Sequence, residues 1–287
     1  MQFLYSGITS GSIYALVAIG FNIIYNTTGI INFAQGEFVM LGGMFIYSLL
    51  YMAGIPFFFS FILAILLAFV FGVVFERIFI RYVKVKTELN LITITIAASI
   101  ILRGLSMVVW GRDTLLVKSF IPSEVIHLYK GTLTTESLLV VGVSMAVSFI
   151  LTFFFKKTKY GKAFRACYED KTAASVCGID VKKVVMASFG IAAVLGATAG
   201  IVISPITYVT YNDGIMTGLK GFSAAVLGGL GSFWGGIAGG ILLGVTESFF
   251  ASIIPSGYKD AMAFFIILLI LFFRPQGIFG IKRVDRV

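Results

Sequence analysis

The chain has 287 residues, of which 59% are hydrophobic and 12% are charged, against about 25% charged residues in ordinary soluble domains. A chain this apolar cannot cover its outside with polar groups, so its outside must face lipid, and a soluble globular protein is excluded. Its formal net charge of +9 sits largely in three basic clusters that each adjoin a hydrophobic segment. That pattern is typical of cytosolic loops in membrane proteins and argues against nucleic-acid binding.

Hydropathy predicts membrane segments near residues 3–25, 31–52, 57–75, 90–110, 137–155, 184–205, 215–250 and 259–274. Phe57–Phe75 carries no charge, and as a helix it spans about 28 Å of a hydrocarbon core of about 30 Å. The spans must be helical because lipid offers no partners to open backbone groups. Met1–Gly20 lacks the basic start of a signal peptide and reads as a retained helix. We predict an all-α polytopic integral membrane protein with eight or nine membrane helices in a single domain, residues 1–287.

The basic clusters predict the orientation of the chain. They are Arg77, Arg81, Lys84 and Lys86; the segment 156–183, with eight of the 22 basic residues; and Arg274, Lys282, Arg283 and Arg286. The positive-inside rule places all three in the cytosol. Since three hydrophobic segments precede the first cluster, we expect the N-terminus outside the cell and the C-terminus in the cytosol.

A polar stretch joins the first two predicted spans. Asn22 precedes it, and Asn32, Gln35 and Glu37 lie within it. One interpretation is a tight turn whose side chains cap helix ends. The other is a gate or a contact with a partner, because charged groups at membrane depth are costly and mark functional sites by default. On the predicted topology this stretch lies near the cytosolic face.

Three further charged residues fall inside predicted spans, namely Arg103, Lys220 and Glu247. Each is close enough to a helix end for snorkelling or a local ion pair to account for it. The sequence has no phosphate-binding loop and no His-Glu-x-x-His metal motif. Cys167 and Cys177 have no nearby histidine to complete a zinc site. We therefore expect no catalytic residue, no cofactor and no metal.

The segment 156–183 is the one long charged stretch, and its sequence predicts short helices. Asp170 can cap a brief helix over the next seven residues, and Gly178 is placed to end it in a left-handed turn. We expect this helix to expose the small residues Ala173 and Ala174 to the groove of another protein. Since so short a helix is marginal in water, it needs a partner or tertiary support. The alternative is a basic loop that only touches anionic lipid.

The segment 215–250 must cross the membrane twice, or enter and return, if the second and third basic clusters are both cytosolic. Eleven glycines lie between Gly214 and Gly244. We expect two short helices that meet at a break in Gly231–Gly236, forming a broken or re-entrant pair. Irregular backbone at membrane depth requires surrounding protein or water. Small residues four apart also let helices pack closely, so packing and lining of a pathway are both open for these glycines.

Four blocks in chain order resemble one family. Gly161–Ala166 together with the pattern Glu169-Asp170-x-x-Ala173-Ala174-x-x-x-Gly178-Ile179 is similar to the cytoplasmic coupling loop of ABC importer permeases. The other blocks resemble the permease subunits of branched-chain amino acid importers, the shorter of their two types; they are Gly11–Leu16 running to Ile31–Phe38, Gly221–Ser232 and Arg274–Phe279. Many members have a histidine where this chain has Gln35, so no titratable role carries over there.

This resemblance implies a permease subunit of an ATP-driven importer for branched-chain or other small neutral amino acids, in a bacterial or archaeal cytoplasmic membrane. The implied partners are a second permease, identical or related, two cytosolic ATPase subunits that hydrolyse the ATP, and an external solute-binding protein. The residues that match the docking helix are Asp170, Ala173, Ala174, Gly178 and Ile179. Our candidates for the pathway or gate are Asn22, Asn32, Gln35, Glu37, Gly228, Gly229 and Gly231.

A different class of function is a secondary transporter or channel for small neutral solutes that works without ATPases. It predicts ligands for a coupling ion or a ring of charges at mid-membrane, and neither pattern occurs in the sequence. The solute itself stays open, because selectivity in such importers rests largely on the binding protein and related members carry urea or amides.

Overall fold

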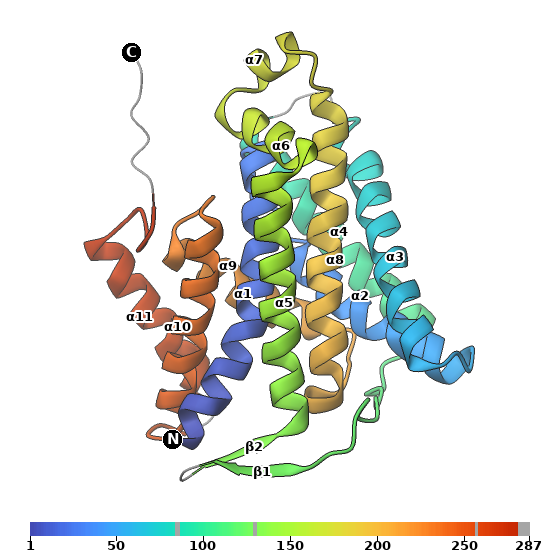
Figure 1. Ribbon diagram of the computed structural model, residues 1–287, viewed down its shortest axis with the longest axis vertical. Helices are drawn as coiled ribbons and strands as arrows, with labels where there is room; N and C mark the ends of the chain where they lie inside the picture. Colours follow the sequence, from blue (N-terminus) through green and yellow to red (C-terminus); the bar gives the residue numbers. More distant parts are fainter. Residues whose placement is uncertain (84–86, 129–130, 256–257, 281–287) are drawn as a thin grey trace.

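The computed structural model describes residues 1–83, 87–128, 131–255 and 258–280. Of the basic clusters, Lys84, Lys86, Lys282, Arg283 and Arg286 lie outside the described residues. The predicted all-α membrane fold is confirmed (Figure 1). Its elements are α1 (Gln2–Thr28), α2 (Gln35–Tyr47) with a π-helical turn (Ser48–Met52), α3 (Phe57–Phe75) with a second one (Glu76–Ile80), α4 (Glu88–Trp110), β1 (Val125–Leu128), β2 (Gly131–Thr134), α5 (Thr135–Lys157), α6 (Lys159–Glu169), α7 (Lys171–Val176), α8 (Val181–Thr207), α9 (Asp213–Gly228), α10 (Phe233–Ala251) and α11 (Lys259–Phe273).

Six of the described helices are long and apolar enough to cross a membrane, namely α1, α3 with its extension to Ile80, α4, α5, α8 and α10. The buried centre consists of α1 and α8, most of whose residues contact protein. In contrast, α3, α4 and α5 turn apolar side chains such as Phe58, Val108 and Phe149 outward. An apolar outer surface of this kind is what a lipid environment requires.

Glycines bring α1 and α10 into close contact. A Cβ added at Gly11 would lie 2.8 Å from the Cα of Ile241 and 2.9 Å from the carbonyl oxygen of Gly240. In the same way, one added at Gly7 would lie 2.6 Å from the Cα of Val245. Because these neighbours are backbone atoms, the two helices approach this closely only where side chains are missing.

Two shorter helices, α2 and α9, begin in the interior rather than at an end of the bundle. Their first turns meet there, since a Cβ added at Gly36 would lie 2.9 Å from the carbonyl carbon of Gly214. The glycine-rich segment does form two helices, and its break falls at Gly229–Ser232, slightly before the predicted position. The reason is that the Ser232 hydroxyl accepts a hydrogen bond from the Gly235 N–H (3.0 Å) and starts α10 there.

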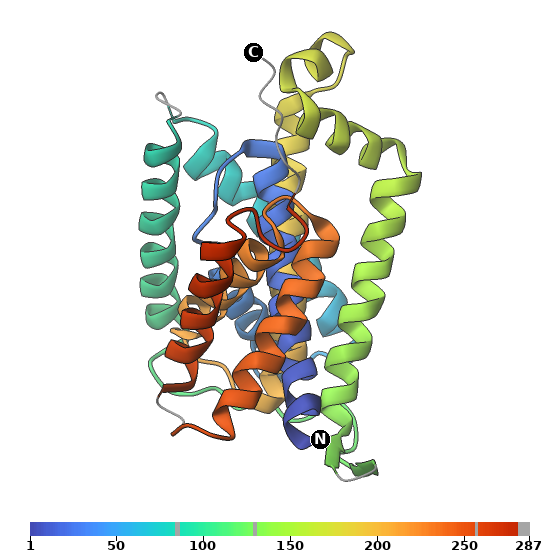
Figure 2. The same cartoon turned by 90° about the vertical axis from the view of Figure 1, so that its left-hand side faces the viewer.

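The two ends of the bundle differ in their structure. One end carries α6 and α7, and the opposite end carries the N-terminus and the antiparallel β1–β2 hairpin (Figures 1 and 2). The Thr132 N–H donates to Gln2 Oε1 (2.7 Å), which joins the hairpin to the start of α1. The N-terminus and the loop 156–183 therefore lie at opposite ends, as the basic clusters predicted.

Candidate functional site

The helix expected within the loop 156–183 is present as α7. The carboxylate of Asp170 accepts hydrogen bonds from the N–H groups of Thr172 (2.7 Å) and Ala173 (3.0 Å), which caps the start of the helix. Gly178 has a φ of 81°, in the left-handed region, and the Ile179 N–H donates to the carbonyl of Ala174 (3.0 Å). Both ends of α7 are therefore closed by the residues that the sequence singled out.

The two alanines of α7 differ in exposure, and the expectation that both are exposed is wrong. Ala173 is exposed, whereas Ala174 is only 3% exposed and packs into the same apolar cluster as Phe164 and Val184. On a helix, adjacent positions point about 100° apart, and α7 packs against the protein on one side only, so it buries Ala174 and leaves Ala173 exposed.

A direct contact ties α7 to the membrane domain. The Lys171 ammonium donates to the carbonyl oxygen of Thr28 (2.8 Å), one of the unpaired carbonyls at the end of α1. Beneath α7, Phe164 and Cys167 of α6 are buried. Burial raises the pKa of the Cys167 thiol, and the nearby charge of Lys171 opposes this more weakly. The loop is thus a packed structure and not a free basic strand.

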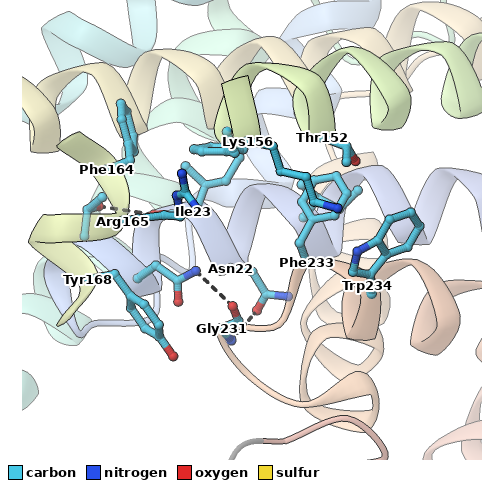
Figure 3. Close-up of a pocket in the computed structure, with 14 residues that line it drawn as sticks. Asn22, Ile23, Thr152, Lys156, Phe164, Arg165, Tyr168, Gly231, Phe233 and Trp234 are labelled. Atoms are coloured by element: carbon cyan, nitrogen blue, oxygen red, sulfur yellow. Dashed lines mark hydrogen bonds between the residues drawn. The ribbon is translucent and has the colours of Figure 1, made fainter. Parts of the chain in front are cut away.

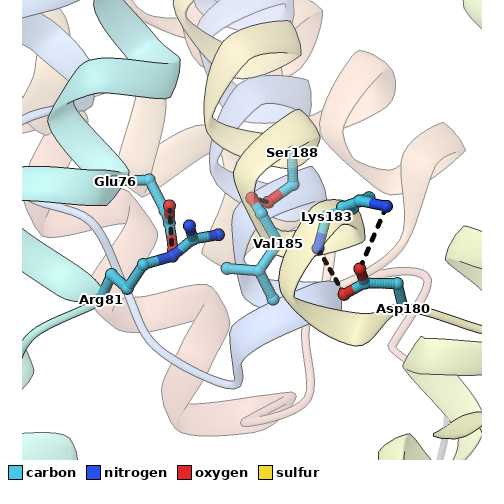
Figure 4. A network of polar contacts seen from close by, with 6 residues as sticks. All are labelled: Glu76, Arg81, Asp180, Lys183, Val185 and Ser188. Carbon is cyan, nitrogen blue, oxygen red and sulfur yellow. Dashed lines mark hydrogen bonds and ion pairs between the residues drawn. The ribbon is translucent and has the colours of Figure 1, made fainter.

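Polar contacts also order the segment that returns from the loop to α8 (Figure 4). Asp180 accepts a hydrogen bond from the Lys183 N–H (3.2 Å), which caps α8 and, with the other hydrogen bonds there, lowers the pKa of the Asp180 carboxyl. Nearby, Arg81 pairs with the buried Glu76 (3.6 Å) at the end of α3. Each of these contacts is local, so they order the start of α8 and the end of α3 separately.

Asn22 and Asn26 of α1 hold the turn between α9 and α10 (Figure 3). The Asn22 side chain accepts a hydrogen bond from the Gly231 N–H (3.0 Å) and donates to the Ser232 carbonyl (2.8 Å). Asn26 donates to the Gly231 carbonyl (2.9 Å). Gly231 and Gly229 both have positive φ values, and other residues rarely adopt that conformation. The chain after α11 adds to this turn, since the Phe279 N–H donates to the Gly228 carbonyl (2.9 Å).

Next to this turn lies a cavity of about 250 Å³ between α1, α5, α6 and α10. Asn22 and Gly231 line it together with Tyr168 of α6 and the basic Lys156 and Arg165 (Figure 3). The structure therefore brings two of the predicted pathway residues to one place, close to the loop that carries α7.

The other predicted polar residues lie elsewhere. Asn32 is buried and its side chain accepts a hydrogen bond from the Ala34 N–H (3.2 Å), as in a turn. Gln35 is also buried and donates to the carbonyl of Ala192 in α8 (2.9 Å). The carboxylate of Glu37, 1% exposed, accepts a hydrogen bond from Ser99 (2.7 Å) and pairs with Arg103 (3.3 Å).

We expected Glu37 at the same end of the bundle as the loop 156–183, and this expectation is wrong. Its partner Arg103 lies about 22 Å along α4 from the start of that helix, and α4 starts at the end of the bundle that carries α6 and α7 (Figure 2). The chain after α1 does not turn at the surface. It runs back into the interior, where the Phe33 N–H already donates to Thr95 of α4 (3.2 Å).

A second cavity, of about 380 Å³, is lined by Tyr14, Lys220 and Glu247, none of which was among the predicted site residues. Tyr14 donates from its hydroxyl to one oxygen of Glu247 (2.8 Å), and the Lys220 ammonium donates to the other (2.8 Å). Of the two explanations offered for Lys220 and Glu247, snorkelling or a local ion pair, the structure shows an ion pair, which these two residues form with each other beside a cavity. Charges at membrane depth were the only signal for this pair, and no pattern pointed to Tyr14.

Within the described part of the chain, no three histidine, cysteine, aspartate or glutamate side chains come together as a metal site would require. The described residues instead form a short capped helix at one end of the bundle, a hydrogen-bonded glycine turn and two cavities.

Comparison with known proteins agrees with this arrangement. Residues 3–271 match the family model described as branched-chain amino acid transport system / permease component. The chain is similar to the high-affinity branched-chain amino acid transport system permease protein LivH of Salmonella typhimurium, with 35% identity over 100% of this chain and 97% of the relative. It is 34% identical to BraD of Pseudomonas aeruginosa over 100% of this chain and 98% of the relative. A probable LivH of Methanocaldococcus jannaschii is 26% identical over 99% of this chain and 94% of the relative.

Proposed function

This chain belongs to the permease component family of the branched-chain amino acid transport systems, and we propose that it is the membrane-embedded permease subunit of an ATP-driven importer for branched-chain or other small neutral amino acids. A permease component is a transport subunit and not an enzyme. The single domain 1–287 forms the pathway with a second permease, identical or related. Two cytosolic ATPase subunits supply the energy, and an external binding protein delivers the solute.

The protein is a multi-pass protein of the inner membrane. In the proposed orientation, the end with α6 and α7 faces the cytosol and the N-terminus faces outside. The described basic residues Arg77 and Arg81 and those of the loop 156–183 are then cytosolic, as the positive-inside rule requires. In this orientation α9 and α10 form the broken pair: α9 starts within the membrane, and α10 returns from a turn near the cytosolic face. Such backbone is tolerated because protein surrounds it.

Coupling to the ATPases takes place through α7. The structure of α7 supports this most directly. It is a six-residue helix that is capped at both ends and exposes Ala173, and Lys171 connects it to α1. Asp170, Gly178 and Ile179 shape the helix, and Ala174 seats it on the membrane domain. When the ATPases close on ATP, the groove that holds α7 moves it, and this chain contributes no covalent step.

Movement of α7 has a short route to the pathway. Lys171 contacts the carbonyl of Thr28, the last residue of α1, and the same helix carries Asn22, which holds Gly231. A displacement of α1 therefore acts on the α9–α10 turn without passing through a flexible loop. We assign the cytosolic gate to this turn, with Asn22, Gly228, Gly229 and Gly231.

Asn32, Gln35 and Glu37 form the second group of proposed gate residues. They fasten the start of α2 to α4 and α8 by buried hydrogen bonds and one ion pair. Because buried polar contacts are costly to break without replacement, any movement of α2 between transport states must exchange these partners for others.

The test of coupling is Ala173→Glu. A carboxylate at this exposed position leaves the membrane domain intact but must be desolvated when α7 enters a groove, which costs several kcal/mol when the charge is unpaired. We expect the variant to insert and fold normally, to lose co-purification of the ATPases and to lose ATP-dependent leucine uptake in proteoliposomes.

The matched control is Lys162→Glu, an exposed position of α6 in the same loop. It changes the charge of the loop by more than Ala173→Glu does. It should nevertheless retain the ATPases, because it leaves the exposed face of α7 unaltered. Normal uptake by Ala173→Glu would contradict docking through α7. Uptake by the wild-type chain without any ATPase subunit would support a secondary transporter instead.

A further inference from the structure

The cavity of about 380 Å³ is enclosed by five helices and lies away from α7 and the glycine turn. Its size falls at the lower end of the range for small-molecule sites, about 300–1,000 Å³. Its lining comes from α1, α2, α8, α9 and α10 and from the chain between α8 and α9. The exposed residues Tyr208 and Asn212 lie on its lining beyond the end of α8, which is the outer side in the proposed orientation.

One part of the lining is charged and largely withdrawn from solvent. The side chains of Lys220 and Glu247 are 11% and 9% exposed and lie 2.8 Å apart, and Tyr14, 8% exposed, donates to the same carboxylate. These groups come from α9, α10 and α1. Charged side chains in membrane segments are costly and are retained at sites of function.

A different part of the lining is apolar. It consists of Ile13, Val39 and Met40, which are buried, and of Ile203 and Met216. The hydroxyl-bearing Ser10 and Thr217 also line the cavity, and Thr217 lies one turn before Lys220 on α9, so both side chains share one face of the helix. A second carboxylate, Asp213, lines the cavity at a partly exposed position, and both of its oxygens accept hydrogen bonds from Thr210. The cavity thus combines a buried pair of opposite charges, one partly exposed carboxylate, hydroxyls and aliphatic walls.

We propose that this cavity is an internal binding site for a zwitterionic α-amino acid with an aliphatic side chain, a conclusion that rests on the proposed transport function. The ligand carboxylate contacts Lys220 and the Thr217 hydroxyl, and the ligand ammonium contacts Glu247 and the Tyr14 hydroxyl oxygen. Its side chain lies against Val39, Met40 and the other aliphatic walls.

Charge balance explains why a zwitterion suits this site. Lys220 and Glu247 neutralise each other when the cavity is empty, and a zwitterion placed between them replaces their contact with two equivalent ones. The charges of the buried pair and its ligand sum to zero in both states, and Asp213 lies apart from them, partly exposed and hydrogen-bonded to Thr210. An amino acid with a net charge, such as lysine or glutamate, would add an uncompensated charge at low dielectric, which is strongly disfavoured. The site therefore selects neutral amino acids independently of the binding protein.

The test uses the complete importer in nanodiscs without its binding protein, because an internal site must act without delivery. A cysteine is introduced by Ser10→Cys, at a lining position that contacts neither charged end of the ligand, and its reaction with a small methanethiosulfonate reagent is followed by mass spectrometry. L-leucine should slow this reaction in a concentration-dependent way, and equal concentrations of L-lysine or L-glutamate should not. The exposed native Cys177, at the opposite end of the bundle, reports any effect of leucine unrelated to the cavity.

Two variants then address the charged groups. Lys220→Met should weaken protection by leucine by about tenfold or more, since it removes a hydrogen bond to a charged group. The exchange of both residues, Lys220→Glu with Glu247→Lys, keeps an ion pair and so keeps the fold. It should still lose protection by L-leucine and gain protection by D-leucine, because interchanging two of the contacts to a chiral centre selects the mirror-image ligand. Arg81→Met, which breaks a partly buried ion pair far from the cavity, should leave protection unchanged.

The outcomes separate this inference from the transport function. If the wild-type importer moves leucine with ATP but leucine does not protect the cysteine, the internal site is wrong and the transport function stands. Equal protection by leucine, lysine and glutamate would contradict the charge argument. Full protection by L-leucine in the exchanged variant would mean that Lys220 and Glu247 stabilise the fold and do not bind the ligand. Absence of ATP-dependent uptake by the wild-type complex would instead overturn the proposed function.

Discussion

Replacing Gly11 with alanine should weaken the membrane domain by forcing α1 away from α10. The added methyl group would lie 2.8 Å from the Cα of Ile241, whereas ordinary contact begins at 3.4 Å. The helices must therefore separate by about 0.6 Å at this crossing, because the atoms in the way are backbone atoms that cannot rotate aside. Overpacking of this kind costs about 1–3 kcal/mol.

Gly104→Ala and Gly142→Ala are matched controls. Both glycines lie within helices, α4 and α5, and nothing lies within 4 Å of a Cβ added at either position. All three substitutions gain the same helix propensity, at most about 1 kcal/mol, so this gain cancels in the comparison. Gly11→Ala should therefore be less stable than either control by about 1–3 kcal/mol.

The measurement is unfolding of the purified full chain by SDS in mixed micelles, followed by circular dichroism. The free energy of unfolding of each variant is compared with that of the wild-type chain. Equal stability of Gly11→Ala and the two controls would refute the reasoning, because it would mean that the close approach of α1 and α10 does not require glycine.

Three further outcomes are expected. A membrane-impermeant maleimide added from the cytosolic side should label the exposed Cys177 much faster than Cys167, which is buried and has a raised pKa; faster labelling of Cys167, or labelling of Cys177 from outside only, would contradict the loop structure or the orientation. Arg103→Met should lower the free energy of unfolding of the chain by several kcal/mol, because it leaves the buried Glu37 carboxylate without its cation. The double change with Glu37→Gln should recover most of this loss. Asp180→Ala should destabilise the start of α8, whereas Asp180→Ser should not, because serine can also cap a helix. Since the pKa of Asp180 is lowered in the folded state, the stability that its carboxylate gives to α8 is complete above the ordinary aspartate pKa and is lost as the pH falls through the lowered value. Hydrogen exchange of α8 at acidic pH can follow this loss.

Much of the fold follows from local sequence. Long uncharged runs predict membrane helices because lipid leaves an exposed backbone no partner. The caps of α7 follow from Asp170 and Gly178, since each acts on atoms within a few residues of itself. The break after α9 was also predictable from its glycines, although Ser232 set its position by capping α10.

Errors arose where a residue's role depends on what it packs against. Ala173 and Ala174 are the same residue type side by side, and only the packing of α7 on Phe164 makes one of them buried. Glu37 was placed near the surface because its sequence reads as a polar turn. Its depth depends on α4, whose Ser99 and Arg103 supply the partners.

By itself, the sequence determined that this protein is a helical membrane protein, that its loop 156–183 contains a short capped helix, and which family it resembles. The first two features depend on composition, periodicity and interactions between near neighbours, and the resemblance depends on four blocks of sequence in chain order. Only the tertiary structure decided that Tyr14, Lys220 and Glu247 meet in one cavity. Tyr14 and Glu247 are 233 positions apart, and their contact is created by the packing of α1, α9 and α10, for which no single segment carries a local signal.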